Sequence, residues 1–523
     1  MLSKVYTGAV IGIDGLLMEV EVDIAHGLPA FTTVGLPEAS VRESRERVKS
    51  AIINCGYDFP DDRITVNLAP AHIRKGGTGF DLPIALGILA AGGIFPETAA
   101  GQYVILGELA LDGRIKPVTG ALSMALAAKS SGFSGIMVPG ENASEAAVVA
   151  QLDVYPVSTL AEAVGFLRGE KAVEREASRA AIEFKPDEEP EVNFSEVSGQ
   201  GHVKRALEVA AAGGHNMLMT GPPGSGKTML AKRFAGIIPP LSFDEAIETT
   251  KIYSVADLLP RGRAMISQRP FRAPHHTISN AGLIGGGSNP RPGEVSLAHN
   301  GVLFLDELPE FRKSVLEVLR QPLEDREVTI SRASMSTTYP AGFMLIAALN
   351  PCPCGYLTDE RHPCRCTSAQ IQQYRNRMSG PLMDRIDLHV EVPNVSYREM
   401  SCKKPAESSV AIRKRVSKAR AIQAERFARL KIYTNSQMSS RHIRRHCTLD
   451  DASSRILETA MDRLGLSARA YHRILKIART IADLDGQARM ASAHVLEAIQ
   501  YRSVDRNAAG YAPGAGINHN RLE

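Results

Sequence analysis

The sequence predicts an α/β protein of several domains, with a parallel nucleotide-binding core and a helical C-terminal part. Three observations support this fold class. A glycine-rich loop at residues 220–228 lies between an apolar, strand-like run and a helix-like run. A second apolar run, at 301–305, ends in the acidic pair Asp306-Glu307. Residues 401–505 are predominantly helical in pattern, and those at 471–482 carry apolar side chains at helical spacing.

Composition places the chain among globular proteins without membrane spans. Its 523 residues are enough for about two to four domains, each with its own core. Hydrophobic content of 44% and charged content of 23% are ordinary. No apolar run is long enough to cross a bilayer, and the N-terminus lacks a signal-peptide pattern. We therefore expect a cytoplasmic protein with no membrane partner.

The charge is distributed unevenly along the chain. The formal net charge is only +4, yet residues 401–450 hold 13 Lys and Arg against 3 Asp and Glu. The rest of the chain is therefore net acidic. A basic block confined to one region indicates a polyanion as partner.

The first unit, residues 1–168, has the pattern of a mixed α/β domain. Its alternating segments predict strands, and longer stretches between and after them have helical periodicity. The predicted strands are 16–24, 31–36 and 63–68, and the predicted helices are 38–54 and 80–91.

Two segments are expected to lack a packed core. Residues 169–193 are polar, acidic and contain proline, which is typical of a linker and unfavourable for contact with DNA. The tail, 507–523, is rich in Gly, Ala and Asn, and we expect it to be disordered. The nucleotide-binding core should then occupy 194–400 and a helical lid 401–506.

The glycine loop has the spacing Gly-x4-Gly-Lys-Thr that cradles phosphate groups. Glycines let backbone amides turn towards phosphate oxygens, and the following helix adds the positive end of its dipole. Lys227 can reach the β- and γ-phosphates of ATP, and the Thr228 hydroxyl can ligate Mg2+. The predicted cofactor-binding residues are Gly221, Pro222, Pro223, Gly224, Ser225, Gly226, Lys227, Thr228 and Asp306.

The acidic pair completes the predicted chemistry of this site. A buried strand that ends in Asp306-Glu307 brings two carboxylates to the edge of a sheet beside the phosphates. Asp306 can organise Mg2+, and Glu307 can orient or deprotonate the attacking water. Together with the glycine loop, this pair predicts an ATP hydrolase.

The segment between Lys227 and Asp306 contains the paired histidines His275-His276. They could bind a metal, but adjacent side chains point apart in a strand and about 100° apart on a helix. We therefore favour packing or contact with a substrate. Farther along, residues 327–350 have the pattern of a hairpin that leads into a core strand ending at Asn350.

Four cysteines directly follow that strand. Two Cys-x-Cys pairs with nine residues between them, Cys352/Cys354 and Cys364/Cys366, can place four thiolates around Zn2+. The spacing is tighter than in the common Cys-x2-Cys knuckle, and free buried thiols are the alternative. His362 lies inside the loop and could replace one cysteine as a ligand.

In these motifs nearly the whole chain resembles the ComM/YifB family of magnesium-chelatase-like AAA+ ATPases. Residues 1–168 resemble the Lon-protease-like, ribosomal S5-type domain of that family. The resemblance identifies the 327–350 hairpin as one that faces the pore of a ring, with Arg332 as a DNA-backbone contact or a solvated turn residue. It also identifies Asn350 as a sensor of the γ-phosphate.

The same resemblance assigns two arginines. Arg385, in Ser379-Gly380-Pro381-Leu382-Met383-Asp384-Arg385, matches an arginine that enters the ATP site of the neighbouring subunit. A local salt bridge to Asp384 or Asp387 is the alternative. Arg469 matches the lid arginine that senses the γ-phosphate, with Arg473 one turn later as its substitute.

The Lon-type resemblance does not extend to a protease active site. The aligned segments put Gly79 where the serine nucleophile would be and Leu122 where the lysine would be. A nucleophile needs an oxygen and a base within hydrogen-bond reach, and these two residues supply neither. Thr78 with Lys75 could form a displaced dyad, but we favour a structural or DNA-facing role for this domain.

The resemblance implies an ATP-dependent DNA helicase that forms a ring, expected to be a hexamer. It would bind single-stranded and branched DNA, drive branch migration, and promote integration of single strands in natural transformation and homologous recombination. ATP, Mg2+ and Zn2+ are the implied cofactors. The alternative is a magnesium-chelatase-type motor that remodels a protein partner. A protease and a non-catalytic DNA scaffold are less favoured.

Overall fold

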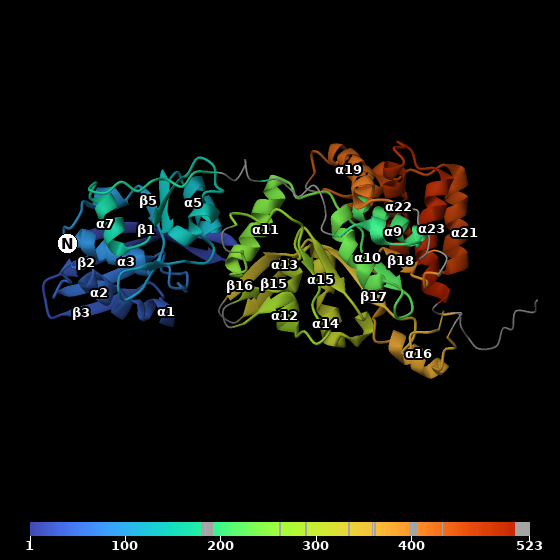
Figure 1. The fold of residues 1–523 in the computed structure, drawn as a ribbon, viewed down its shortest axis with the longest axis horizontal. Helices are drawn as coiled ribbons and strands as arrows, with labels where there is room; N and C mark the ends of the chain where they lie inside the picture. The colour runs from blue at the N-terminus through green and yellow to red at the C-terminus, as the bar shows by residue number, and fades with distance from the viewer. Residues whose placement is uncertain are drawn as a thin grey trace, which may run out of the picture.

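The computed structural model describes residues 1–178, 184, 192–260, 263–287, 290–332, 335–357, 359, 362–396, 399, 406–430 and 432–507. Figure 1 shows the N-terminal strands at the left, the C-terminal helices at the right, and the middle part of the chain between them. The chain is a mixed α/β protein, as the sequence predicts. Residues 179–183 and 185–191 of the expected linker and 508–523 of the expected tail lie outside the described residues.

The N-terminal sheet has seven strands in the order β3-β4-β2-β1-β5-β8-β9. The β1/β2 and β2/β4 pairs are antiparallel, whereas the other neighbours are parallel. The strands expected from the sequence overlap β2, β3 and β4. The bounds are β1 (Leu2–Ile11), β2 (Asp14–Ala25), β3 (Ala30–Val34), β4 (Arg63–Ala69), β5 (Tyr103–Ile105), β8 (Gly135–Pro139) and β9 (Asp153–Val157).

Helix α3 (Asp81–Ala91) is the most deeply buried helix of this unit. It packs against β1 and β2, and nearly all its residues are buried, as expected for a helix that is apolar on every side. The expected helices therefore correspond to α3 and to α1 with α2. The remaining short elements are α1 (Ala39–Arg42), α2 (Ser44–Asn54), α4 (Glu97–Ala100), β6 (Glu108–Leu109), β7 (Ile115–Lys116), α5 (Ala121–Ser130), η1 (Gly140–Asn142), α6 (Ala143–Ala146) and α7 (Leu160–Leu167).

The second sheet has five parallel strands in the order β11-β14-β17-β10-β18. All residues of β14 and β17 are buried, which fits strands covered by helices on both faces. Helices α9 and α10 flank β10. The bounds are η2 (Phe194–Glu196), α9 (Gly201–Gly213), β10 (Met217–Thr220), α10 (Lys227–Phe234), η3 (Ala235–Ile237), β11 (Phe271–Arg272), β14 (Val302–Leu305), β17 (Met344–Leu349) and β18 (Leu388–Glu391).

Two small hairpins extend from this core. The β12/β13 pair lies in the segment between the glycine loop and Asp306, and the expected hairpin before Asn350 is present as β15/β16. The two touch, because a Cβ atom on Gly285 would lie 2.8 Å from Ile330 Cδ1. The bounds are α11 (Phe243–Val255), α12 (Asn280–Ile284), β12 (Gly285–Gly286), β13 (Arg291–Pro292), α13 (Glu294–Leu297), η4 (Leu308–Glu310), α14 (Lys313–Val318), α15 (Arg320–Asp325), β15 (Glu327–Arg332) and β16 (Met335–Pro340).

The C-terminal part is helical, and its helices pack on α9 and on one another. Ser467 caps α22 by accepting a hydrogen bond from the Ala470 amide at 3.3 Å, as the sequence predicts. None of the described helices is long and apolar enough to cross a membrane. The bounds are α16 (Ser368–Arg375), α17 (Gly380–Met383), α19 (Ser409–Arg426), η5 (Asn435–Gln437), α20 (Ser440–His446), α21 (Asp451–Leu464), α22 (Ala468–Leu484) and α23 (Ser492–Asn507).

A buried joint links the N-terminal sheet unit to α11 of the second unit. The Glu145 carboxylate accepts hydrogen bonds from the Ser254 hydroxyl and, at 2.9 Å, from the Leu122 amide. The Gly120 amide donates to Ser254 Oγ at 3.0 Å. Burial raises the pKa of Glu145, although these hydrogen bonds oppose the rise. An ion pair between Lys251 and Asp14 adds a second contact at the surface.

Candidate active site

The glycine loop joins β10 to α10 and encloses the side chain of Lys227. Gly224 and Gly226 have φ angles of +79° and +87°, a region that favours glycine, and α10 begins directly after the loop. The Lys227 ammonium donates to the carbonyls of Gly221 at 2.8 Å and Pro222 at 2.9 Å. Burial lowers the pKa of this amine, although nearby acids oppose the shift. Two carbonyls of the loop thus hold the Lys227 ammonium in place.

Thr228 and Asp306 meet beside this lysine. The Thr228 hydroxyl donates to Asp306 Oδ2 at 2.6 Å, and the Asn350 amide oxygen lies 3.3 Å from Lys227 Nζ. These residues come from α10 and from the carboxyl ends of β14 and β17, which are neighbours in the sheet. A hydroxyl and a carboxylate are oxygen ligands of the kind that Mg2+ prefers. The residues present therefore fit the expected magnesium site.

The backbone of Glu307 adopts a conformation that the sequence analysis did not predict. Its φ angle is +51°, which is uncommon for a residue with a side chain, and its amide donates to Asp306 Oδ1 at 3.0 Å. Its Oε2 lies 3.7 Å from Nδ1 of His276. The rings of His275 and His276 are packed together with centroids 4.1 Å apart. His276 thus contacts the acidic pair, a role that sequence reasoning missed because the two segments are about thirty residues apart.

Among the described residues, the histidine pair is not part of any group of side chains that could hold a metal. Within the part of the chain that the structure describes, only the four cysteines form such a group. Packing or contact with a substrate stays the prediction for His275 and His276.

Arg385 and Arg469 do not lie with the glycine loop. Both line a cavity of about 650 Å3 that also contains Asn216. Asn216 immediately precedes β10, and Gly221 immediately follows it. The strand between them has four residues, so the two edges of the sheet are about 13 Å apart at 3.3 Å per residue. The two arginines therefore lie at the amino-terminal edge of the sheet, where its parallel strands begin. The phosphate loop lies at the carboxyl-terminal edge, where the strands end.

Arg385 pairs with neither of the nearby aspartates. Its Nη2 lies 2.7 Å from Glu324 Oε1, and its Nη1 donates to the Pro381 carbonyl at 2.7 Å. Its Nε atom is buried without a hydrogen-bond partner among the described residues. The guanidinium is thus held at the wall of the cavity by one carboxylate from α15.

Asp387 instead ties the sheet to the lid. It contacts Arg473 of α22, lies 3.3 Å from His215 Nδ1, and accepts the Asn216 amide at 3.1 Å. Burial would raise the pKa of Asp387, but Arg473 and His215 outweigh burial and hold it well below its usual range. Arg473, the substitute for Arg469 in the sequence analysis, is therefore engaged in a buried ion pair.

The β15/β16 hairpin presents a polar face to solvent. Hydroxyl pairs bridge its strands, Thr329 with Thr338 at 3.0 Å and Ser331 with Ser336 at 3.2 Å. All four of these residues are exposed. Val328 and Ile330 on the opposite face are buried. Arg332 is exposed at the end of β15.

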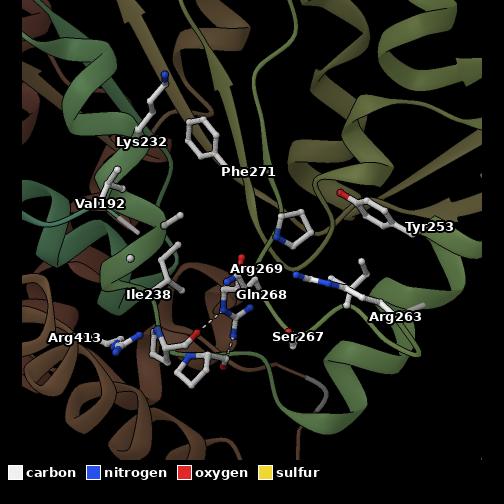
Figure 2. A pocket seen from close by; sticks show the side chains of 16 residues that line it. Val192, Lys232, Ile238, Tyr253, Arg263, Ser267, Gln268, Arg269, Phe271 and Arg413 are labelled. Atoms are coloured by element: carbon white, nitrogen blue, oxygen red, sulfur yellow. Dashed lines mark hydrogen bonds between the residues drawn. The ribbon is translucent and has the colours of Figure 1, made fainter. Parts of the chain in front are cut away.

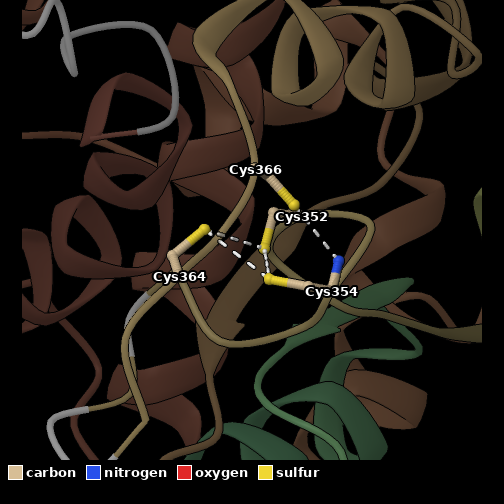
Figure 3. A group of neighbouring side chains, drawn as sticks. All are labelled: Cys352, Cys354, Cys364 and Cys366. Carbon is tan, nitrogen blue, oxygen red and sulfur yellow. Dashed lines mark hydrogen bonds between the residues drawn. The ribbon is translucent and has the colours of Figure 1, made fainter.

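The four cysteines form one compact cluster after β17. Figure 3 shows their sulfur atoms facing one another. Cys352 Sγ lies 3.4 Å from Cys354 Sγ and 3.6 Å from Cys364 Sγ, and all four sulfurs lie within 4.8 Å. Tetrahedral Zn–S bonds of 2.3 Å place sulfurs about 3.8 Å apart. The thiols therefore fit a Zn2+ ion with a small expansion of the cluster.

Local hydrogen bonds affect the acidity of this cluster. Burial raises the pKa of Cys354, but amide hydrogen bonds from Tyr356 and Arg365, with the adjacent thiols, lower it to about 6. Cys352 is fully buried, and burial with two thiol neighbours raises its pKa to about 12. His362 is directed to Asp359, with Nδ1 3.4 Å from Oδ2, and does not belong to the group that could hold a metal.

Thr78 and Lys75, the alternative displaced dyad, each bond to another group. The Thr78 hydroxyl donates to Glu108, and the buried Lys75 ammonium donates to the Pro70 carbonyl. Gly79 and Leu122 occupy the aligned catalytic positions without a hydroxyl or an amine. These contacts give Thr78 no lysine as base.

A further cavity, of about 380 Å3, lies beyond the C-terminal end of α10. Figure 2 shows Arg263 on one side of it and Arg413 on the other, with Gln268 and Arg269 between them. None of the 16 described residues that line it is acidic. No sequence motif predicted this basic cavity, because its residues come from five separate segments of the chain.

Comparison with known proteins agrees with this architecture. Residues 193–400 match the family model of magnesium chelatase subunit ChlI, 20–142 match a second model of that subunit, and 406–502 match its C-terminal model. The chain is 44% identical over 514 residues to competence protein ComM of Haemophilus influenzae, covering 97% of this chain and 98% of that protein. It is 44% identical over 506 residues to YifB of Escherichia coli, with 97% and 98% covered.

A shorter similarity concerns the N-terminal unit. Lon protease 2 of Bacillus subtilis is 31% identical over 158 residues, which is 28% of this chain and 27% of that protein. The similarity to ComM and YifB, in contrast, extends over almost the full length of both partners. The chain therefore belongs to the ComM/YifB family of magnesium-chelatase-like AAA+ proteins.

Proposed function

We propose that this protein is a ring-forming, ATP-driven DNA helicase that promotes branch migration and integration of single-stranded DNA in natural transformation and homologous recombination. One observation carries the proposal. The phosphate-loop residues lie at one edge of the five-stranded sheet, and Arg385 with Arg469 lies at the other. Neither edge alone is a complete hydrolytic site, but the two edges of adjacent copies complement each other.

Each residue has a defined part in this scheme. Lys227 binds the β- and γ-phosphates of ATP, Thr228 and Asp306 hold Mg2+, and Asn350 positions the γ-phosphate. Glu307 takes the proton of the attacking water. Mg2+, when bound, supplies charge neutralisation of the phosphates.

The neighbouring copy supplies two cations in addition to Lys227. Its Arg385 and Arg469 stabilise the charge that develops on the transferred phosphoryl group. This arrangement assigns the lid arginine to the same neighbouring copy as Arg385, because both line one cavity. A closed ring, which we take to be a hexamer, fills every site in this way.

Single-stranded and branched DNA are the proposed substrates. Arg332 and the exposed hydroxyl face of the β15/β16 hairpin offer contacts to phosphate groups. The lid adds an exposed basic surface that suits a polyanion. Its exposed cations include Lys414, Lys418, Arg429, Arg441, Arg444 and Arg445.

The cysteine cluster is proposed as a structural zinc site with Cys352, Cys354, Cys364 and Cys366 as ligands. Four thiolates with no open position are typical of structural rather than catalytic zinc. A reducing compartment keeps such thiols available, which supports a cytoplasmic location.

We also propose the domain division 1–168, 194–400 and 401–506, with 169–193 as linker and 507–523 as tail. Each of the first two ranges contains one of the two main sheets, which supports the division.

A second candidate is a magnesium-chelatase-type motor that remodels a protein partner. The matches of 193–400 and 406–502 to chelatase models favour it. The two candidates differ in their response to DNA, which only the first requires.

The deciding experiment measures ATP hydrolysis by the purified full chain with and without single-stranded, forked and three-way DNA, together with strand separation. We expect DNA to stimulate hydrolysis and the branched substrates to be resolved, with both activities absent in Lys227→Ala. Binding should weaken with salt, because counterions are released on binding. An ATPase rate insensitive to every DNA form would overturn the helicase and leave the protein-remodelling motor.

A further inference from the structure

The cysteine cluster touches the nucleotide loop. Gly355 directly follows the Cys352-Pro353-Cys354 turn, and its amide donates to the Cys352 carbonyl at 3.0 Å. A Cβ atom on Gly355 would lie 2.6 Å from Cδ and 2.9 Å from Cγ of Pro223. Pro223 is in the centre of the glycine loop, so the backbone of the cysteine turn packs directly against that loop.

The same turn also adjoins the expected sensor residue. Only Pro351 separates Asn350 from Cys352, and a Cβ atom on Gly355 would lie 3.8 Å from Asn350 Cγ. Asn350 in turn contacts Lys227 Nζ at 3.3 Å. Contacts of the cysteine turn therefore reach two sides of the nucleotide site, its loop and its sensor.

We propose that the four-cysteine centre is a brace for the nucleotide loop, so that metal binding and nucleotide binding are coupled through the Gly355–Pro223 contact. The inference rests on the proposed zinc and ATP sites, but not on DNA or helicase activity. A metal ion crosslinks two cysteine pairs that are otherwise joined only by a loop, and so fixes the position of Gly355. A fixed Gly355 keeps Pro223 in the position that the loop needs around phosphates.

Coupling of this kind is reciprocal. If metal favours nucleotide binding, nucleotide must favour metal retention by the same factor. The effect of metal on nucleotide affinity and the effect of nucleotide on metal release therefore report the same coupling free energy. Neither measurement depends on ATP hydrolysis.

The key variant is Gly355→Ala, which keeps all four cysteines but places a methyl group against Pro223. Its matched control is Gly132→Ala, because Gly132 has a similar φ of +82° against +85° and open space around its Cβ position. The measurements are zinc content by colorimetric release, affinity for a fluorescent ATP analogue, and the thermal unfolding midpoint. We expect Gly355→Ala to retain zinc and to bind nucleotide about 5- to 150-fold more weakly, the range typical of coupled sites.

The metal itself is removed with the Cys364→Ser/Cys366→Ser double variant, for which Cys55→Ser is the control outside the cluster. We expect loss of zinc and a similar loss of nucleotide affinity. Should the double variant fail to fold, Gly355→Ala still decides the question.

The reciprocal measurement follows zinc release from wild-type protein to an excess of chelator, with and without saturating ADP and no added Mg2+. We expect ADP to slow the release, and Gly355→Ala to weaken this protection. Equal nucleotide affinity of Gly355→Ala and Gly132→Ala, a release rate unchanged by ADP, or wild-type protein that binds no zinc would each overturn the brace. Failure of the helicase assays alone would leave it standing, whereas wild-type protein that binds no ADP would overturn the ATPase proposal with it.

Discussion

At Glu307, two constraints act on one carboxylate. Its backbone lies in the left-handed region at φ +51°, and His276 lies 3.7 Å from its Oε2. His276 follows β11, and the chain then continues through α12 to the β12 strand that touches the β15/β16 hairpin. The hairpin that we propose to contact DNA is thus connected to Glu307, the proposed general base, through one short segment.

We expect His276→Ala to raise ATP hydrolysis in the absence of DNA, because Glu307 is released to meet the attacking water. Stimulation by DNA should fall accordingly. The measurement is the steady-state rate with and without single-stranded DNA. His275→Ala is the control, since its Nδ1 bonds Thr277 Oγ1 at 2.9 Å. An unchanged basal rate in His276→Ala would contradict a restraining role.

Asp387 gives a prediction about pH. Its pKa is depressed in the folded protein by Arg473 and His215, so its ionised form is favoured by folding. Its contribution to stability is full above the ordinary Asp pKa of about 3.9 and is lost as the pH falls below that value towards the depressed one. Asp387→Asn should therefore lower the free energy of unfolding by about 3–5 kcal/mol near neutral pH, because it leaves buried charges unpaired.

The check is the thermal midpoint as a function of pH for wild type, Asp387→Asn and the neighbouring control Asp384→Asn. The gap between wild type and Asp387→Asn should narrow below about pH 4. Parallel curves for the two proteins would show that Asp387 does not supply this acid-sensitive component.

The residues that form the site were predictable where a motif fixes their spacing. Gly221 to Thr228 and Asp306 come together in space as their pattern requires. The partner of Glu307, the Glu324 contact of Arg385, and the edge on which Arg469 lies were not predictable. They depend on contacts between residues distant in sequence, and no local pattern records such contacts.

Among the elements, the β15/β16 hairpin has the clearest division of faces. Val328 and Ile330 pack inward, whereas the hydroxyl pairs and Arg332 face solvent. We expect Arg332→Ala to weaken binding of single-stranded DNA almost uniformly across sequences. The slope of log K against log salt should fall by about 1, the effect of losing one phosphate contact.

Anisotropy titrations at several salt concentrations give this slope directly. Arg312→Ala serves as the matched control, because Arg312 is an exposed arginine outside the hairpin. Equal slopes for wild type and Arg332→Ala would mean that Arg332 is a solvated residue and makes no contact with DNA.

Element types followed from periodicity, because burial of one face leaves a local signature. The hairpin and α22 were predictable in this way, whereas α3 and the strand before Asp306, which are buried on nearly every side, were recognisable as apolar runs. The sheet order β11-β14-β17-β10-β18 was not, since parallel neighbours are joined by long crossovers. The order matters for function because it places β14, β17 and β10 side by side and thus brings Asp306, Asn350 and the glycine loop to one edge.

For the whole molecule, the division of the site between two edges predicts complementation. Lys227→Ala and Arg385→Ala should each be inactive in ATP hydrolysis when tested alone. A mixture should regain part of the activity, because an interface between the two variants can combine an intact lysine with an intact arginine. Rates measured across mixing ratios test this.

The control mixture is Lys227→Ala with Asp306→Asn, which damages the same edge twice and should stay inactive. Assembly of the mixture of Lys227→Ala and Arg385→Ala is verified by size-exclusion chromatography. If the assembled mixture does not hydrolyse ATP, this would contradict a site shared between copies. The overall α/β architecture was predictable from the sequence, but the distance between Arg469 and the glycine loop emerged only from the sheet as a whole.

The joint between the two units has an evolutionary consequence. Leu122, at the position where Lon-type proteases carry their lysine, gives its amide to Glu145, and Glu145 in turn holds Ser254 of the ATPase unit. A mutation to lysine there would insert a charged chain into a buried joint and loosen it long before a nucleophile had appeared at Gly79. The joint with the ATPase unit therefore constrains which side chains position 122 can carry.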